Sequence, residues 1–72
     1  MNNLIPFKSR AEAIRLSRAL TRKRIAHTVI NTPRSLGVSC GLSVLFYSAS
    51  LEIVNATISE LGLQTGQGIF KR

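Results

Sequence analysis

Apolar positions along the chain repeat with two different spacings, which predict four strands and two helices. Short runs of apolar or β-branched residues have the length of strands, and they cover residues 4–7, 26–31, 42–47 and 69–70. The first helix is predicted over residues 10–24, where Ser9 and Glu12 form a capping box. Its apolar side consists of Ala13, Leu16 and Leu20.

The second helix is predicted to begin at Ser48 or Ser50 and to stop at Gly62, a residue suited to end a helix. Its apolar positions follow helical spacing and are Leu51, Val54, Ile58 and Leu61. A turn at residues 64–67 leaves room for a short last strand. The predicted order is therefore strand, helix, strand, strand, helix, strand.

This order predicts an α+β domain with the ferredoxin-like βαββαβ arrangement. Right-handed crossovers place both helices on one face of a four-stranded antiparallel sheet. The continuous apolar run at 42–47 suits a central strand, whereas Pro6 lacks a backbone donor and is awkward in one. Three residues are expected on the face without helices, where an apolar patch would favour a homodimer or docking to a larger partner: Val29, Leu45 and Tyr47.

Length and composition limit the chain to one compact domain, residues 1–72, with 44% hydrophobic residues. No apolar run is long enough to span a bilayer, and the first residues lack the basic start and apolar stretch of a signal peptide. We therefore expect a cytoplasmic protein that has no membrane partner.

Charge is strongly biased, because ten Lys and Arg residues against three acidic ones give a formal charge of +7. Such a field attracts polyanions, and tRNA is one candidate partner. Within the first helix, three arginines recur on the side opposite the apolar stripe: Arg15, Arg18 and Arg22. These arginines form either a solvated helix face or a face that docks an anion.

The clearest candidate for chemistry is Cys40, the sole cysteine, in the loop between the second and third strands. One thiol forms no internal disulfide and is too few for a structural zinc site, so Cys40 is either a packed small residue or a nucleophile. Arg34 would favour the thiolate by its charge. Three neighbours suit contact with an anion: Gly37, Ser39 and Gly41. The competing explanation for the glycines is turn geometry. For Arg34 the competing explanation is an ordinary position on the surface.

The segment from Pro33-Arg34 to Cys40-Gly41 resembles a family of small bacterial selenium or sulfur carrier-like domains. The resemblance extends over nearly the whole chain, and it rests on Phe7, Ser9, Ala11, Glu12, Pro33, Arg34, Cys40 and Gly41. It implies that Cys40 accepts a sulfane sulfur or a reduced selenium atom, holds it as a persulfide or selenyl sulfide, and passes it to an acceptor enzyme. Donor and acceptor proteins are then the partners, and the chain is a carrier more than a self-contained enzyme.

An RNA-binding module with a structural cysteine is the alternative, and the positive charge is its main support. Its weakness is the placement of aromatic residues, because Phe46 and Tyr47 fall on opposite faces of a strand and only one can stack on a base. Binding that falls steeply with salt would favour RNA, whereas loss of function in Cys40→Ser would favour carriage.

Other chemistry finds little support in the sequence. His27 has no second ligand nearby and is expected to be structural. The carboxylates are expected as helix caps or solvent-facing residues: Glu12, Glu52 and Glu60. There is no phosphate-binding glycine loop, nucleotide fingerprint or paired cysteine motif. We therefore expect neither a metal site nor a cofactor.

Overall fold

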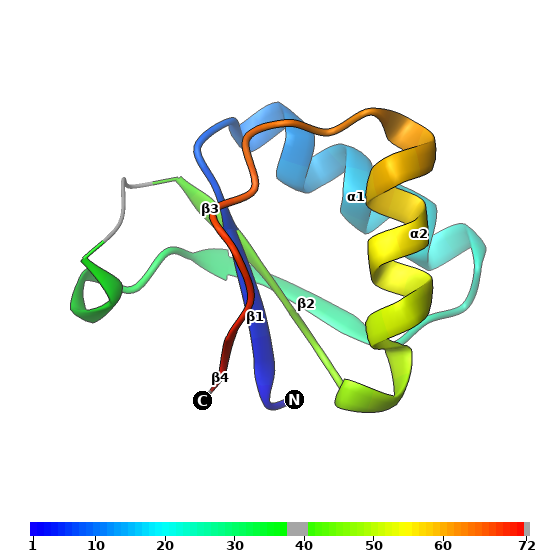
Figure 1. The fold of residues 1–72 in the computed structure, drawn as a ribbon, viewed down its shortest axis with the longest axis horizontal. Coiled ribbons are helices and arrows are strands. Elements are labelled where there is room, and N and C mark those ends of the chain that lie inside the picture. Colours follow the sequence, from blue (N-terminus) through cyan, green and yellow to red (C-terminus); the bar gives the residue numbers. More distant parts are fainter. Residues whose placement is uncertain (38–40, 72) are drawn as a thin grey trace.

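A computed structural model describes residues 1–37 and 41–71, in which a four-stranded antiparallel sheet carries two helices on one side (Figure 1). The strands are β1 (Asn3–Phe7), β2 (His27–Asn31), β3 (Leu42–Phe46) and β4 (Phe70–Lys71). The helices are α1 (Arg10–Arg22) and α2 (Leu51–Leu61), and the 3-10 turns are η1 (Arg34–Leu36) and η2 (Ser48–Ser50). The predicted βαββαβ order and the ferredoxin-like topology are confirmed.

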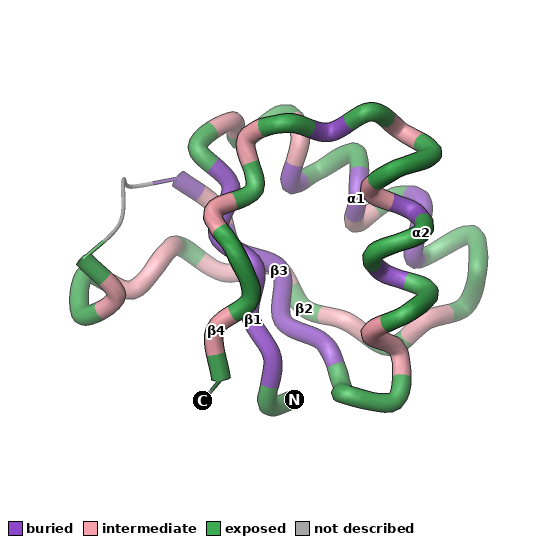
Figure 2. The backbone as a smooth tube through the Cα atoms, in the orientation of Figure 1, coloured by how far each residue is buried: buried purple, intermediate pink, exposed green. Residues whose placement is uncertain are grey.

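The strand order is β2-β3-β1-β4, so β1 and β3 are the middle strands. Five residue pairs join β1 to β3, from Asn3–Phe46 to Phe7–Leu42, and β2 pairs with β3 over the same length. Figure 2 shows that burial is concentrated along these two middle strands. The prediction of a central strand from residue 42 is therefore confirmed, and this strand ends at Phe46.

Pro6 is accommodated in a middle strand because its missing donor points to the weakly paired side. The backbone N–H of Gln67 donates to the carbonyl oxygen of Pro6 at 2.8 Å. The N–H and C=O of one strand residue point to the same side, so the absent N–H of Pro6 faces the C-terminal segment and not β3. That segment pairs with β1 at Gly66 and then again at Phe70–Lys71.

The hydrophobic core lies between the sheet and the two helices. Its buried members are Ile5, Phe7, Ala13, Leu16, Leu20, Val44, Phe46, Val54 and Leu63. Val29 packs against this cluster, so its predicted place on the other face is wrong. Leu45 alternates with Val44 onto the other face, but it is only 6% exposed, whereas Tyr47 is 50% exposed. A homodimer through that face stays a prediction.

Both helices are followed by a residue in the left-handed conformation. Gly62, with φ 67°, follows α2 as predicted. Arg24, with φ 59°, takes the corresponding place after α1, and the N–H of Ile25 donates back to Leu20 O at 2.9 Å. α1 therefore ends at Arg22, before the predicted end at residue 24. Ser50 occupies the N-cap position of α2, although its hydroxyl makes no capping bond.

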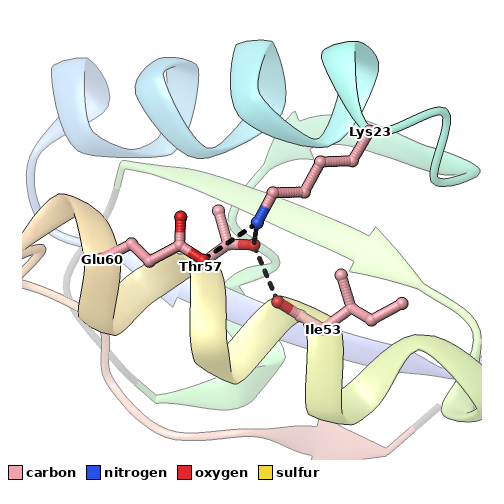
Figure 3. Close-up of polar contacts among 4 residues, drawn as sticks. All are labelled: Lys23, Ile53, Thr57 and Glu60. Carbon is pink, nitrogen blue, oxygen red and sulfur yellow. Dashed lines mark hydrogen bonds and ion pairs between the residues drawn. The ribbon is translucent and has the colours of Figure 1, made fainter.

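A polar contact that starts from Lys23 joins α1 to α2. The Nζ of Lys23 donates to Thr57 Oγ1 at 2.7 Å and lies 3.3 Å from Glu60 Oε1 (Figure 3). The Thr57 hydroxyl is buried and donates in turn to Ile53 O at 2.7 Å. Lys23 thus helps to hold the helices together, although the sequence places it in a run of basic residues.

Candidate functional site at the cysteine loop

The cysteine loop leaves the sheet at the end where β2 stops and β3 starts, which we call the loop end. Asn31 of β2 pairs there with Leu42 of β3, and Leu42 also pairs with Phe7 of β1. The C-terminal segment arrives at the same end, because Phe7 also bridges to Gly66, and α1 begins shortly after Phe7. Segments that are far apart in the sequence thus meet around the base of the loop.

The loop is described on both sides of a gap at residues 38–40. The predicted nucleophile Cys40 and its neighbour Ser39 therefore lie outside the described residues, and their roles stay predictions. Before the gap, residues 32–37 extend to the side away from the helices (Figure 1). After the gap, Gly41 is buried.

Gly41 is required by a close approach to β1. A Cβ atom at this position would overlap the carbonyl oxygen of Phe7 and crowd that of Lys8. The carbonyl of Gly41 also accepts a hydrogen bond from Thr32 N at 3.0 Å, so the residue after Cys40 lies between β1 and the segment that follows β2. Glycine alone fits here without a shift of the backbone. Close packing explains why residue 41 is a glycine, and this reason was not among the expectations from the sequence. Contact of Gly41 with an anion stays a prediction.

Arg34 and Gly37 belong to one 3-10 turn before the gap. Gly37 has φ 67° and donates its N–H to Arg34 O at 3.1 Å, a left-handed turn conformation that favours glycine. The turn geometry considered for Gly37 is therefore confirmed. Arg34 is exposed at the first position of η1. Its effect on the Cys40 thiolate stays a prediction.

Glu12 fixes the C-terminal segment to the start of α1 at the loop end. Its Oε1 accepts hydrogen bonds from Gln64 N at 2.9 Å, from Thr65 N at 2.8 Å and from Thr65 Oγ1 at 2.8 Å. The bond from the Thr65 backbone is the main cause that lowers the pKa of Glu12 from its ordinary value, because it favours the charged form.

The predicted capping box is only half correct. Ser9 Oγ accepts a hydrogen bond from Glu12 N at 3.2 Å, as in an N-cap. The reciprocal bond from Ser9 N to the Glu12 carboxylate is not formed. The carboxylate accepts from Thr65 instead, and Ser9 N donates to Thr65 Oγ1 at 3.2 Å. Glu12 and Thr65 are 53 positions apart, so no local pattern in the sequence indicates their contact.

The loop end, with its buried glycine after the cysteine, lies within the part of the chain that matches a known family. The family described as "Putative Se/S carrier protein-like" matches residues 2–69. The chain belongs to this family. The resemblance stated from the segment between Pro33 and Gly41 is therefore confirmed. Comparisons with curated proteins and with solved structures gave no match.

In this Se/S carrier-like chain, the three arginines predicted on one side of α1 differ in their contacts. All three are exposed: Arg15, Arg18 and Arg22. Arg15 Nη2 donates to Leu61 O at 3.3 Å, which satisfies a carbonyl at the end of α2 and places a cation there. Arg15 is therefore already engaged within the fold, and contact of the set with a polyanion stays a prediction.

His27 is engaged on both ring nitrogens in the carrier-like domain. Its Nδ1 donates to Ile25 O at 2.8 Å, and its Nε2 lies 2.8 Å from Ser17 Oγ. Across residues 1–37 and 41–71, no three His, Cys, Asp or Glu side chains group closely enough to hold a metal ion. In the same ranges, none of the helices has the length and apolar character needed to cross a membrane.

A cavity of about 310 Å³ lies between α2, β1 and the C-terminal segment of the carrier-like chain. Its described lining consists of aliphatic side chains, two amides and two glycines: Ile5, Asn55, Ile58, Leu63, Gln64, Gly66, Gly68 and Ile69. These lining residues include no charged side chain. The cavity is therefore unsuited to an anionic sulfur or selenium species, which needs a cation or several donors.

Proposed function

We propose that this chain carries a sulfur or selenium atom on Cys40 between a donor and an acceptor protein. The observation that carries the proposal is membership of the Se/S carrier-like family over residues 2–69. Cys40 is the sole cysteine, so a carrier that uses a thiol has no other residue for the task. The family description names the cargo and not the residue, and the role of Cys40 is therefore the part to test.

The transfer is a thiol exchange that needs no oxidant. The Cys40 thiolate attacks the outer sulfur of a donor persulfide, R–S–SH, the S–S bond of the donor breaks, and the donor leaves as a thiolate. Cys40 then holds a persulfide. In the second exchange an acceptor thiolate takes the outer sulfur and Cys40 leaves as the thiolate. A donor of the form R–S–SeH reacts in the same way at selenium, with cleavage of its S–Se bond.

Two features of the loop support the negatively charged forms of this exchange. Arg34 is exposed in the turn before the gap, where its guanidinium favours the thiolate and the persulfide anion. Gly41 is held against β1 and bonded to Thr32, which gives the loop a fixed base on the other side of Cys40. The backbone N–H of Gly41 then donates to the transferred atom.

Intact-protein mass spectrometry with a relocated thiol as control tests this carriage. Reduced protein is incubated with a cysteine desulfurase and cysteine, beside Cys40→Ser and the double variant Cys40→Ser with Ser35→Cys. Ser35 is exposed in the same loop, so the double variant keeps a thiol and changes its surroundings. We expect a reducible gain of one sulfur atom in the wild type, none in Cys40→Ser, and a much slower gain in the double variant.

Two outcomes would count against the proposal. An equal rate of gain in the wild type and in the double variant would show that any exposed thiol of this loop suffices, which removes the special role of Cys40. No gain of sulfur in a wild type whose Cys40 reacts readily with an alkylating reagent would overturn carriage.

Alkylation of Cys40 at neutral pH should also slow in Arg34→Gln, because less of the thiol is ionised without the cation.

A further inference from the structure

Three exposed cations lie in segments that start from the loop end of the sheet, and we call this set the cation corner: Lys8, Arg10 and Arg34. Lys8 follows β1 directly, and its carbonyl oxygen lies close to Gly41, the residue after Cys40. Arg34 lies two residues after Thr32, whose N–H donates to Gly41 O at 3.0 Å. The backbone of Lys8 and that of Thr32, two residues before Arg34, therefore both lie beside Gly41 at the base of the loop.

The phase of α1 brings the third cation to the same corner. Arg10 and Ser17 are about two turns apart, so they lie on one side of the helix. Ser17 Oγ lies 2.8 Å from Nε2 of His27, the first residue of β2, which places that side of α1 over β2. Seven helical residues rise about 11 Å, and β2 extends about 13 Å from His27 to Asn31. Arg10 thus lies toward the end of the sheet at which β2 stops and the chain continues to Arg34.

Of the carboxylates that the structure describes, Glu12 is the one at the loop end, so the three cations of the corner exceed the acidic charge there. Glu12 accepts its hydrogen bonds from residues 64–65, and Glu60 pairs with Lys23 at 3.3 Å. Glu52 lies in the first turn of α2, which starts at the end of the sheet opposite the loop end. Among the described residues, no ion pair involves the cation corner.

We propose that the cation corner docks an acidic patch on the proteins that exchange the chalcogen atom with Cys40. The inference rests on the proposed function and names the chemistry of its partners. Complementary charge steers an encounter and sets its orientation, and it affects the rate of association and the choice of partner more than affinity. A partner bound at the cation corner approaches the cysteine loop from the side on which Gly41 fixes that loop to the sheet.

An acidic protein fits this corner better than RNA. Proteins that bind single-stranded RNA stack its bases on aromatic side chains next to the cations. Phe7 and Phe46 are fully buried beneath the helices. Tyr47 follows β3, and Phe70 pairs with Leu4, so both lie toward the opposite end of the sheet. In the described part of the chain, the corner therefore offers charge without a surface for stacking.

Two double charge reversals test the corner against an equal change elsewhere. Lys8→Glu with Arg10→Glu alters the corner, and Arg18→Glu with Arg22→Glu makes the same change in net charge further along α1. All four side chains are exposed, so both variants preserve the core. Each pair is made in Cys40→Ser, so that the result does not depend on carriage, and thermal unfolding of both confirms that they fold.

The probe is a short poly-glutamate peptide, with its Kd measured at low and at physiological salt and its contacts mapped by NMR chemical shifts. We expect the corner variant to weaken binding about tenfold and the control variant less than about twofold. The shifts should centre on Lys8, Gly41 and Arg34. Equal weakening in the two variants, or shifts centred on Arg18 and Arg22, would show that only net charge matters and would overturn the proposal.

A single-stranded RNA oligomer of equal charge is the second probe. We expect it to bind no tighter than the peptide and without preference for the corner. Tighter binding of RNA that the corner variant abolishes would assign the corner to RNA and overturn docking of an acidic protein. The two proposals fail separately, because carriage is judged by sulfur gained on Cys40 and docking is judged in a protein without that thiol.

Discussion

At the loop end of the sheet Gly41 lies against the backbone of β1, whereas at the opposite end Asn3 and Ser48 meet through their side chains. Asn3 Nδ2 donates to Ser48 Oγ at 2.7 Å, and Ser48 Oγ donates to Asn2 Oδ1 at 3.2 Å, with no charged group in the contact. At the loop end, by contrast, the Glu12 carboxylate fastens the C-terminal segment.

The difference separates two kinds of constraint. Close backbone packing at the loop end restricts Gly41 to one residue type but leaves the exposed side chains of Lys8 and Arg10 without a structural task in the described part of the fold. Side-chain contacts tie a residue type to a specific partner, as Asn3 and Ser48 do at the opposite end and Glu12 and Thr65 do at the loop end. Changes at the opposite end should therefore affect stability alone, whereas exposed residues at the loop end can change with the partner that they meet.

The largest effect should come from Gly41→Ala, which brings a Cβ atom onto the backbone of β1. We expect the free energy of unfolding to fall by about 3 kcal/mol, because the obstacle is backbone and has no rotamer to change. Gly37→Ala is the matched control, since open space surrounds its Cβ position and only the left-handed φ is unfavourable. It should cost about 1 kcal/mol. Urea unfolding measures both, and equal losses would contradict the role assigned to Gly41.

An intermediate effect is expected from Asn3→Ala at the opposite end. Asn3 is 1% exposed, and its removal takes away the amide that donates to the Ser48 hydroxyl. The free energy of unfolding should fall by about 1 to 2 kcal/mol. The rate at which Cys40 is alkylated should stay unchanged, because the contact lies far from the loop. A changed rate would show that the two ends of the sheet are coupled.

The smallest effect is expected from Glu12→Gln, which keeps the acceptor oxygen and removes the charge. Because the pKa of Glu12 is lowered in the folded state, its charge stabilises the fold fully above the pKa of an unperturbed glutamate. That contribution disappears as the pH falls through the lower folded-state pKa. At neutral pH the variant should melt a few degrees below the wild type, and the two melting curves should converge in acid. A constant difference at all pH values would contradict this account.

Most of the fold was predictable because it depends on local patterns. The apolar positions of α1 and the continuous run of β3 are properties of short segments, and both lead directly to the observed elements. The placement of Val29 was wrong for a related reason. Thr28, Val29 and Ile30 are all β-branched, so the sequence of β2 shows no clear alternation between polar and apolar faces.

The loop end was predictable in its residues but not in its contacts. Cys40, Arg34 and the two glycines stand out by residue type, whereas the need for glycine at 41 arises from the backbone of β1 across the sheet. The partnership of Glu12 with Thr65 arises in the same way, from a chain reversal that brings distant segments together. Such contacts depend on the completed topology, and local periodicity does not encode them.

Pro6 also limits the ability of β1 to pair with another chain when the C-terminal segment detaches. β4 has only two residues, so this segment is the most weakly paired part of the sheet, and its opening turns β1 into an edge strand. A free edge is a template on which another chain can add a strand, and this is a common start of aggregation. The backbone groups on that edge belong to Leu4, Pro6 and Lys8, and the middle one has no hydrogen to donate. The same residue that interrupts the pairing of β1 with its own C-terminus therefore protects the opened molecule from adding foreign strands.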